Sequence, residues 1–160
     1  MADKASGSAN AHVVVARFAD ALRTLTDNDG MKISELSQIA VEYKALASSI
    51  VAVTEKHIAK CLPNCKLWGL YVEDCIIRKD HKVFGPHFAR NLFDVFTAMY
   101  QVVSREHRAK MDKLLQVWRT PLKDDKFRFG TKESTNQLID RIEAKVSSLR
   151  SQMGATAAGR

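Results

Sequence analysis

The 160-residue chain is long enough for one compact domain with a substantial hydrophobic core. Hydrophobic residues make up 46% of it and charged residues 27%, a composition that excludes a disordered or collagen-like protein. No apolar run reaches the about 18 residues of a membrane span, and 7 Gly and 3 Pro are too few for a barrel or sandwich of many short strands.

The net charge of +7 favours an acidic partner, such as nucleic acid, a phosphopeptide or anionic lipid. The 3 cysteines do not suggest a disulfide framework, so we expect a reducing compartment, the cytoplasm or the nucleus. The first ten residues have no apolar run, which predicts that they are not a secretory signal.

Apolar residues at helical spacing predict three helices in the first part of the chain. The first runs from about Val13 to Leu25, and the second begins near Ser34, a residue type that favours the N-cap. Ser48-Ser49 marks the join to a third helix, which ends at Leu62-Pro63 because the residue before proline avoids the α conformation.

The later part of the chain continues this helical pattern. A fourth helix spans roughly residues 65–79, and Gly85-Pro86 predicts a turn before one or two helices that end near Val103. Ser104 caps the next helix, which Thr120-Pro121 closes. Phe127 and Phe129 are expected to dock back on the body, and the last helix begins near residue 134.

These seven or eight short helices predict an all-α fold in which helix pairs stack as an α-solenoid. We expect a flexible N-terminus over residues 1–12, a helical domain over 13–153 and a flexible tail over 154–160. The periodicity leaves open whether the helix at about 134–153 caps the stack or is an appendage that binds a partner.

The fourth helix carries a polar column between two apolar arcs. Leu67, Tyr71, Asp74 and Arg78 follow one another at spacings of four, three and four, which place them on one narrow face. A buried carboxylate needs a partner. Asp74 therefore either pairs with Arg78 one turn away or lies in the floor of a groove, where it accepts a hydrogen bond from a ligand.

The helix after Ser104 has a basic edge beside its buried stripe of Met111, Leu115 and Trp118. Lys110, Lys113 and Val117 lie on that edge, where two lysines could bind a phosphate or simply face solvent. The turn that contains Asn28 is likewise either a plain polar loop or a rim that offers hydrogen bonds.

Three stretches in order, LYVEDCIIR (70–78), FARNL (88–92) and KLLQVWR (113–119), resemble the CTD-interacting domain, or CID. This module binds the C-terminal tail of RNA polymerase II in cleavage, polyadenylation and termination factors. The resemblance covers roughly Val13 to Pro121. It implies a right-handed superhelix of about eight helices, similar to VHS and ENTH domains, with a peptide groove formed by the second, fourth and seventh helices.

The resemblance also implies roles for individual residues. Asp74 would accept the hydroxyl of the heptad tyrosine, with Tyr71 and Arg78 beside it in the same column. Lys113 would lie near the phosphate on the first serine of the heptad, with Lys110 one turn before it and Val117 one turn after it. Asn28 would frame the groove.

The sequence departs from this family at three places. Cys75 replaces the usual serine, Lys79 replaces an asparagine, and the expected loop at residues 80–84 lacks the usual glycine. These departures leave open which phosphorylation pattern is read.

The resemblance predicts a nuclear, monomeric domain of a larger protein that binds the phosphorylated heptad tail and couples transcription to mRNA 3′-end processing or termination. An RNA-binding module of an mRNA-processing factor is one alternative, because positive charge attracts phosphates. A VHS/ENTH-type trafficking adaptor is another, although the first helix has few basic residues for lipid.

Catalysis is not expected. The chain has no phosphate-binding glycine loop and no G-x-S-x-G or HExxH motif, so we predict neither an enzyme nor a cofactor. His57 and Cys61 lie one turn apart at core positions and no C-x₂-C pair occurs, which disfavours a zinc site. Membrane binding is not expected either.

Overall fold

The computed structural model describes residues 3–158, with side chains over residues 10–154. This part of the chain forms eight α-helices and three short 3-10 helices. The α-helices are α1 (Asp3–Arg23), α2 (Gly30–Glu42), α3 (Ala47–Lys60), α4 (Lys66–Lys79), α5 (His81–Ala89), α6 (Leu92–Val102), α7 (Arg105–Arg119) and α8 (Lys132–Ala158). The 3-10 helices are η1 (Lys44–Leu46), η2 (Pro63–Cys65) and η3 (Lys123–Asp125).

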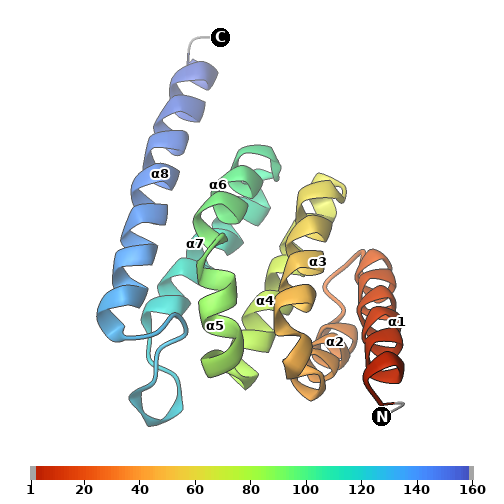
Figure 1. The fold of residues 1–160 in the computed structure, drawn as a ribbon. Helices are drawn as coiled ribbons and strands as arrows, with labels where there is room; N and C mark the ends of the chain where they lie inside the picture. Colours follow the sequence, from red (N-terminus) through yellow and green to blue (C-terminus); the bar gives the residue numbers. More distant parts are fainter. Residues whose placement is uncertain (1–2, 159–160) are drawn as a thin grey trace.

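The helices stack in two layers that build a superhelix. Figure 1 shows α1, α3, α6 and α8 side by side, with α4 and α7 behind them. Contacts between α2 and α4, α1 and α3, α6 and α8, and α7 and α8 join the stack. Each helix therefore buries its apolar stripe against its neighbours, as predicted for an α-solenoid.

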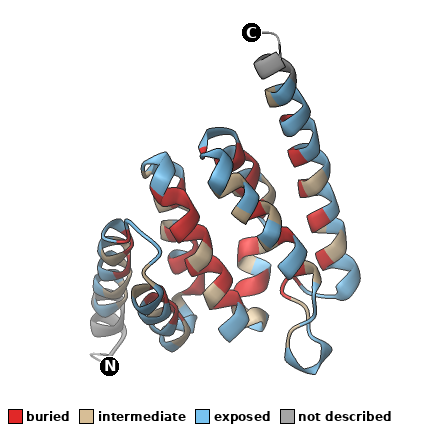
Figure 2. Cartoon of the chain, turned by 180° about the vertical axis from the view of Figure 1, so that it is seen from behind, coloured by how far each residue is buried: buried red, intermediate tan, exposed pale blue. Residues whose placement is uncertain are grey.

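The core runs continuously along the stack. In Figure 2 the buried residues, drawn in red, recur on successive helices from one end of the stack to the other. Trp118 is fully buried at one end of it, with its ring centroid 5.9 Å from that of Phe96 and 5.8 Å from that of Phe129. Phe129 therefore docks on the body, as predicted. Burying an aromatic side chain of this size stabilises the fold by about 1.5–3 kcal/mol.

Four helices begin at side-chain caps, of which the one on α8 is Thr131, whose hydroxyl accepts a hydrogen bond from the backbone N–H of Ser134. Ser104 accepts a hydrogen bond from the backbone N–H of His107, as predicted, and Asp29 and Asp80 cap α2 and α5 in the same way. The second helix therefore begins about one turn before Ser34, the predicted cap. The join to the third helix lies at η1 rather than at Ser48-Ser49, which are inside α3.

The predicted turn at Gly85-Pro86 is wrong. Helix α5 runs through both residues from its cap at Asp80, so the expected loop at 80–84 is largely helical too. Phe84 and Phe88, one turn apart, are both fully buried, and their packing outweighs the poor helix propensity of Gly and Pro. The chain breaks instead at Asn91, which separates α5 from α6.

The last helix packs on α6 and α7 and closes one end of the stack. Its buried apolar residues are Ile139, Ile142, Val146 and Leu149, and Leu138 is half-buried. At the other end, α1 begins at Asp3, ten residues before its predicted start. The predicted flexibility of residues 1–12 and 154–160 falls partly outside the described residues and stays a prediction.

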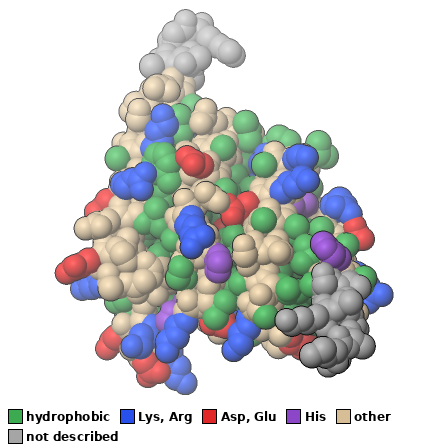
Figure 3. Space-filling view, in the orientation of Figure 1, with side chains coloured by type: hydrophobic (Ala, Val, Ile, Leu, Met, Phe, Trp, Pro, Cys, Tyr) green, Lys and Arg blue, Asp and Glu red, His purple; other side chains and the backbone are tan. Residues whose placement is uncertain are grey.

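Charged side chains of both signs are spread among hydrophobic ones on the face shown in Figure 3. Within residues 3–158, no single helix has the length and apolar content to cross a membrane. One bent pair, Gly30–Glu42 with Lys44–Lys60 at 88°, passes the same test of length and composition when taken together.

Candidate functional site

An open groove of about 660 Å³ lies between α2, α4 and α7. It brings together all seven residues that the sequence placed in a binding site, although they come from positions 28 to 117 of the chain. These residues are Asn28, Tyr71, Asp74, Arg78, Lys110, Lys113 and Val117. We call it the α2–α4–α7 groove. That these residues bind a peptide stays a prediction.

Asp74 lies at the base of the groove with only 8% of its surface exposed. Its Oδ1 accepts a hydrogen bond from the indole N–H of Trp118 at 2.9 Å, and its Oδ2 accepts one from Arg78 Nε at 3.1 Å. The sequence left open whether Asp74 pairs with Arg78 or lines a groove. The structure shows both, because the carboxylate has internal partners and also lines the groove. Each carboxylate oxygen has two lone pairs, so each can accept one more hydrogen bond.

Arg128 supports this carboxylate from behind. Its guanidinium is almost fully buried, with Nε 3.9 Å from Asp74 Oδ1, and its Nη1 donates to the carbonyls of Val117 and Thr120 at the end of α7. Burial lowers the pKa of Arg128 and the nearby Asp74 carboxylate opposes that change. The segment after α7 thus caps the helix and adds positive potential beneath the groove.

The α7 side of the groove is basic. Lys110 Nζ lies 3.8 Å from Glu106 Oε1 on the solvent side, an exposed pair of little strength. Lys113 is exposed and has no ion-pair partner in the described part of the chain. Val117 next to it is 39% exposed and adds an apolar surface. Lys113 is therefore free to meet an anion.

Tyr71 stands half-buried beside Asp74 on the wall of the groove. Its ring meets that of Trp68 edge-on, with centroids 5.7 Å apart, and Trp68 in turn meets His107. Burial, followed by the charge of Asp74, raises the pKa of Tyr71. The phenol therefore stays neutral at physiological pH and keeps its hydroxyl hydrogen as a donor.

Two of the sequence departures join α4 to α2. The thiol of Cys75 donates to Ser37 Oγ at 3.1 Å and also lines the groove, while Lys79 Nζ donates to Gln38 Oε1 at 3.4 Å. The third departure, at residues 80–84, is part of α5 apart from its cap. Cys75 is therefore the departure placed to touch a ligand in the groove.

Sequence reasoning missed several groove residues. Gly30, Ile33, Ser34 and Leu114 also line the groove, and each follows from the register of α2 or α7 once Asp29 is known as the cap. Arg128 lies in an irregular segment with no periodicity, so no sequence signal pointed to it. Trp118 was expected in the core, but its hydrogen bond to Asp74 depends on how the helices pack.

The sequence and the fold both match a known family. The CID domain family matches residues 16–121, and the chain therefore belongs to the CID domain family. This confirms the resemblance seen in the sequence. The solved structure "RPR of Pcf11" superposes with a TM-score of 0.69 at 28% identity, over 82% of this chain and 98% of that one, which confirms the superhelical fold.

Curated relatives are longer proteins. The chain is 41% identical over 102 residues to an uncharacterized protein of Schizosaccharomyces pombe (64% of this chain, 16% of the relative). It is 31% identical over 109 residues to Protein PCF11 of Saccharomyces cerevisiae (68% and 17%) and 34% identical over 90 residues to SR-related and CTD-associated factor 4 of Homo sapiens (52% and 8%). The chain thus spans less than a fifth of the length of each.

Proposed function

We propose that this domain binds the phosphorylated heptad-repeat C-terminal tail of RNA polymerase II and couples transcription to mRNA 3′-end processing or termination. The observation that carries the proposal is the α2–α4–α7 groove, with a carboxylate at its base and an unpaired lysine at its rim. Membership of the CID family supports it, as does the similarity to a protein named a CTD-associated factor.

Asp74 receives the hydroxyl of the heptad tyrosine in this proposal. Two of its lone pairs are held by Trp118 and Arg78, which fix the carboxylate in place, and a remaining lone pair faces the ligand. Because the carboxylate is already oriented, little ordering is required of the protein when the tail binds. Tyr71 and Ile33 supply the ring and the aliphatic surface against which the peptide packs.

Lys113 and Lys110 meet the phosphate on the serine. A charge-assisted hydrogen bond contributes about 1.5–3 kcal/mol, and the tail offers one or two of them. Ordering a flexible tail offsets much of this gain, so we expect micromolar or weaker affinity for a single repeat. Tandem repeats raise the effective affinity because a released repeat is replaced by its neighbour.

This role is that of a binding module rather than an enzyme, and it places the domain in the nucleus as a part of a longer protein. A groove with one carboxylate, two lysines and a phenol suits recognition of a peptide. No cofactor, metal or membrane enters the proposal.

The test is a titration of two-repeat heptad peptides, each phosphorylated at one defined position, against the native protein and three variants. Asp74→Asn should weaken binding of every peptide by about tenfold, because the ligand loses a charged acceptor. Lys113→Glu should abolish the preference for phosphorylated over plain peptide. Lys44→Glu, an exposed lysine of η1 outside the groove, is the matched charge control and should bind normally.

Circular dichroism must first show that the variants are folded. The proposal fails if folded Asp74→Asn binds as the native protein does, or if oligouridine or anionic vesicles bind more tightly than every phosphopeptide. If Lys113→Glu and Lys44→Glu discriminate phosphorylation equally well, Lys113 is a solvated rim residue.

A further inference from the structure

A second hollow of about 470 Å³ lies between α1 and α3, away from the α2–α4–α7 groove. The two share no lining residue, since this hollow is formed by the end of α1, the loop that follows it, one side of α3, and η2. Its volume is within the range of about 300–1,000 Å³ that is typical of ligand sites. We call it the α1–α3 hollow.

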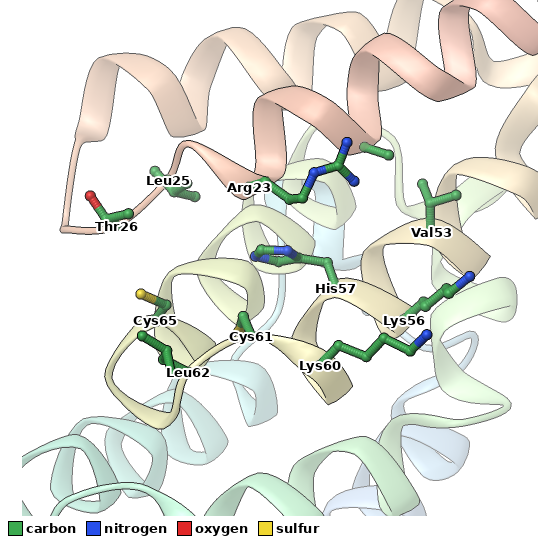
Figure 4. Close-up of a pocket in the computed structure, with 11 residues that line it drawn as sticks. Arg23, Leu25, Thr26, Val53, Lys56, His57, Lys60, Cys61, Leu62 and Cys65 are labelled. Carbon is green, nitrogen blue, oxygen red and sulfur yellow. The ribbon is translucent and has the colours of Figure 1, made fainter.

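One end of the α1–α3 hollow is cationic. Figure 4 shows the guanidinium of Arg23 and the ammonium groups of Lys56 and Lys60 on the same side of the site. Arg23 pairs with Asp20 on the open surface, whereas Lys56 and Lys60 are exposed and have no ion-pair partner within the described residues. No Asp or Glu lines the hollow.

The other end is apolar. Leu25, Leu62, Cys61 and Cys65 lie on the side away from the ammonium groups in Figure 4. Leu62, at the rim of the hollow, is 70% exposed. It extends the apolar surface from the hollow onto the outside of the molecule.

His57 lies between the two ends. Its Nε2 is buried and has no hydrogen-bond partner among the described residues. Burial, together with the charges of Arg23 and Lys66, lowers the pKa of His57, so the ring is neutral at physiological pH and the positive charge comes from Arg23, Lys56 and Lys60. No three His, Cys, Asp or Glu residues in the described part of the chain are placed to hold a metal ion, so His57, Cys61 and Cys65 do not form a metal site.

We propose that the α1–α3 hollow is a second docking site, which binds an acidic segment of a partner protein through one bulky apolar side chain and neighbouring carboxylates. The apolar side chain enters the end lined by Leu25 and Leu62, and the carboxylates meet Arg23, Lys56 and Lys60. Charge complementarity selects the acidic segment, because the lining holds three cations and no anion.

Several features favour a polypeptide over other anions. The lining contains no Phe, Tyr or Trp, and its one aromatic ring, the imidazole of His57, is half-buried. It therefore lacks the broad exposed rings on which the bases of single-stranded RNA stack. A free inorganic anion would make no favourable contact with the apolar half of the hollow. The exposed Leu62 at the rim can contact a polypeptide that continues over the surface of the domain. A small ligand enclosed in the hollow would not reach it. Lys56 and Lys60 are one turn apart on α3, so they present two charges along the line of such a chain.

The experiment is a titration of the isotope-labelled 160-residue chain, followed by nuclear magnetic resonance, with the acetylated probe peptide Asp-Asp-Leu-Phe-Asp-Asp. The probe should shift the amide signals of α3 and of the α1–α2 loop. Lys56→Glu with Lys60→Glu should weaken its binding by about tenfold or more. Lys44→Glu with Lys145→Glu makes the same change of net charge at exposed lysines elsewhere and should have little effect.

Two further peptides separate the two halves of the site. Replacing every Asp of the probe with Asn should abolish binding, and so should replacing its Leu and Phe with Ser. Leu62→Ser, a change at an exposed position, should also weaken the probe, while binding of heptad peptides to the groove stays normal in every variant.

The proposal is wrong if the probe gives no saturable shift at about 1 mM, a concentration at which even weak sites begin to fill. It is equally wrong if the two double variants lose affinity alike, or if the shifts fall on the α2–α4–α7 groove. Equal binding of the Ser-substituted probe, or tighter binding of oligouridine or phosphatidylserine vesicles, would reduce the hollow to a general anion-binding patch.

Discussion

Asp74 and Glu73 are neighbours on α4, yet they point to different sides of the helix and meet different surroundings. Asp74 lies at the base of the groove, where Trp118 and Arg78 donate to it and Arg128 stands behind it. Glu73 is 1% exposed near Glu55 of α3, and its Oε1 has no hydrogen-bond partner among the described residues. Burial alone therefore does not mark a binding carboxylate; an open side and donors that hold the group in place do.

The largest expected effect comes from removing the indole of Trp118, which donates a hydrogen bond to Asp74. Trp118→Ala should lower the free energy of unfolding by about 3–5 kcal/mol, because it leaves a large cavity in the core. Trp118→Phe keeps most of the ring but leaves Asp74 Oδ1 without its donor, at about 1–3 kcal/mol. Urea unfolding measures both values. A Phe variant as stable as the native protein would show that the hydrogen bond to Asp74 does not stabilise the fold.

Gly85 tests the segment that supports Asp74 from behind. A Cβ atom at this position would collide with the backbone carbonyl of Arg128, so Gly85→Ala must displace the segment that carries the guanidinium. We expect a loss of about 1–3 kcal/mol by thermal or urea unfolding. Gly30→Ala is the matched control, because an added Cβ there meets no atom within 4 Å. Equal stability of the two variants would contradict the close contact.

Glu73 tests the other side of α4 through pH. Burial, and then the charge of Glu55, raises the pKa of Glu73 well above its ordinary value, so the folded state binds this proton more tightly than the unfolded state does. The stability that Glu73 contributes is complete below the unfolded pKa of about 4.3 and is lost as pH rises toward the folded pKa. Glu73→Gln should therefore stabilise the protein at pH 8 by about 1–3 kcal/mol.

Urea unfolding at pH 5 and pH 8 provides the measurement for Glu73. The native protein should lose more stability over this interval than Glu73→Gln does. Parallel pH profiles for the two proteins would mean that the carboxyl is charged in the fold and has found a partner.

Cys75 gives the smallest expected effect. Cys75→Ser retains a donor for Ser37 Oγ and should change stability by less than about 0.5 kcal/mol. Cys75→Ala removes the donor and should cost about 0.5–1 kcal/mol, a fall in melting temperature of about 1–4 °C. If Ser and Ala melt alike, the thiol contributes only by packing between α2 and α4.

Local sequence signals predicted much of this fold. Ser104 and Thr120-Pro121 bound α7 because a cap and a proline act through neighbouring backbone groups alone. The same reasoning failed at Gly85-Pro86, where Phe84 and Phe88 pack on distant helices and hold α5 together. Periodicity reports which face is apolar, but it does not report how strongly that face is packed.

The candidate site was likewise predicted in part: some of its residues followed from the sequence, and others depend on how the helices pack. The spacing of Tyr71, Asp74 and Arg78 placed them on one face, and the family resemblance then united them with Lys113 and Asn28 in one groove. The burial of Glu73 could not be predicted from its position on the helix, because it depends on where α3 lies. The contribution of Arg128 was invisible, since it comes from an irregular segment that reaches Asp74 only after α7 has turned back on the core.

The position of Arg128 has a practical consequence for dissecting this protein. The match to the CID domain family ends at residue 121, whereas the guanidinium that caps α7 and the ring that packs on Trp118 follow it, at Arg128 and Phe129. A recombinant fragment that ended at residue 121 would lose both side chains. Asp74 and Trp118 would then lose their contacts with Arg128 and Phe129. A fragment that keeps these contacts therefore extends at least to Phe129, beyond the border that homology alone would draw.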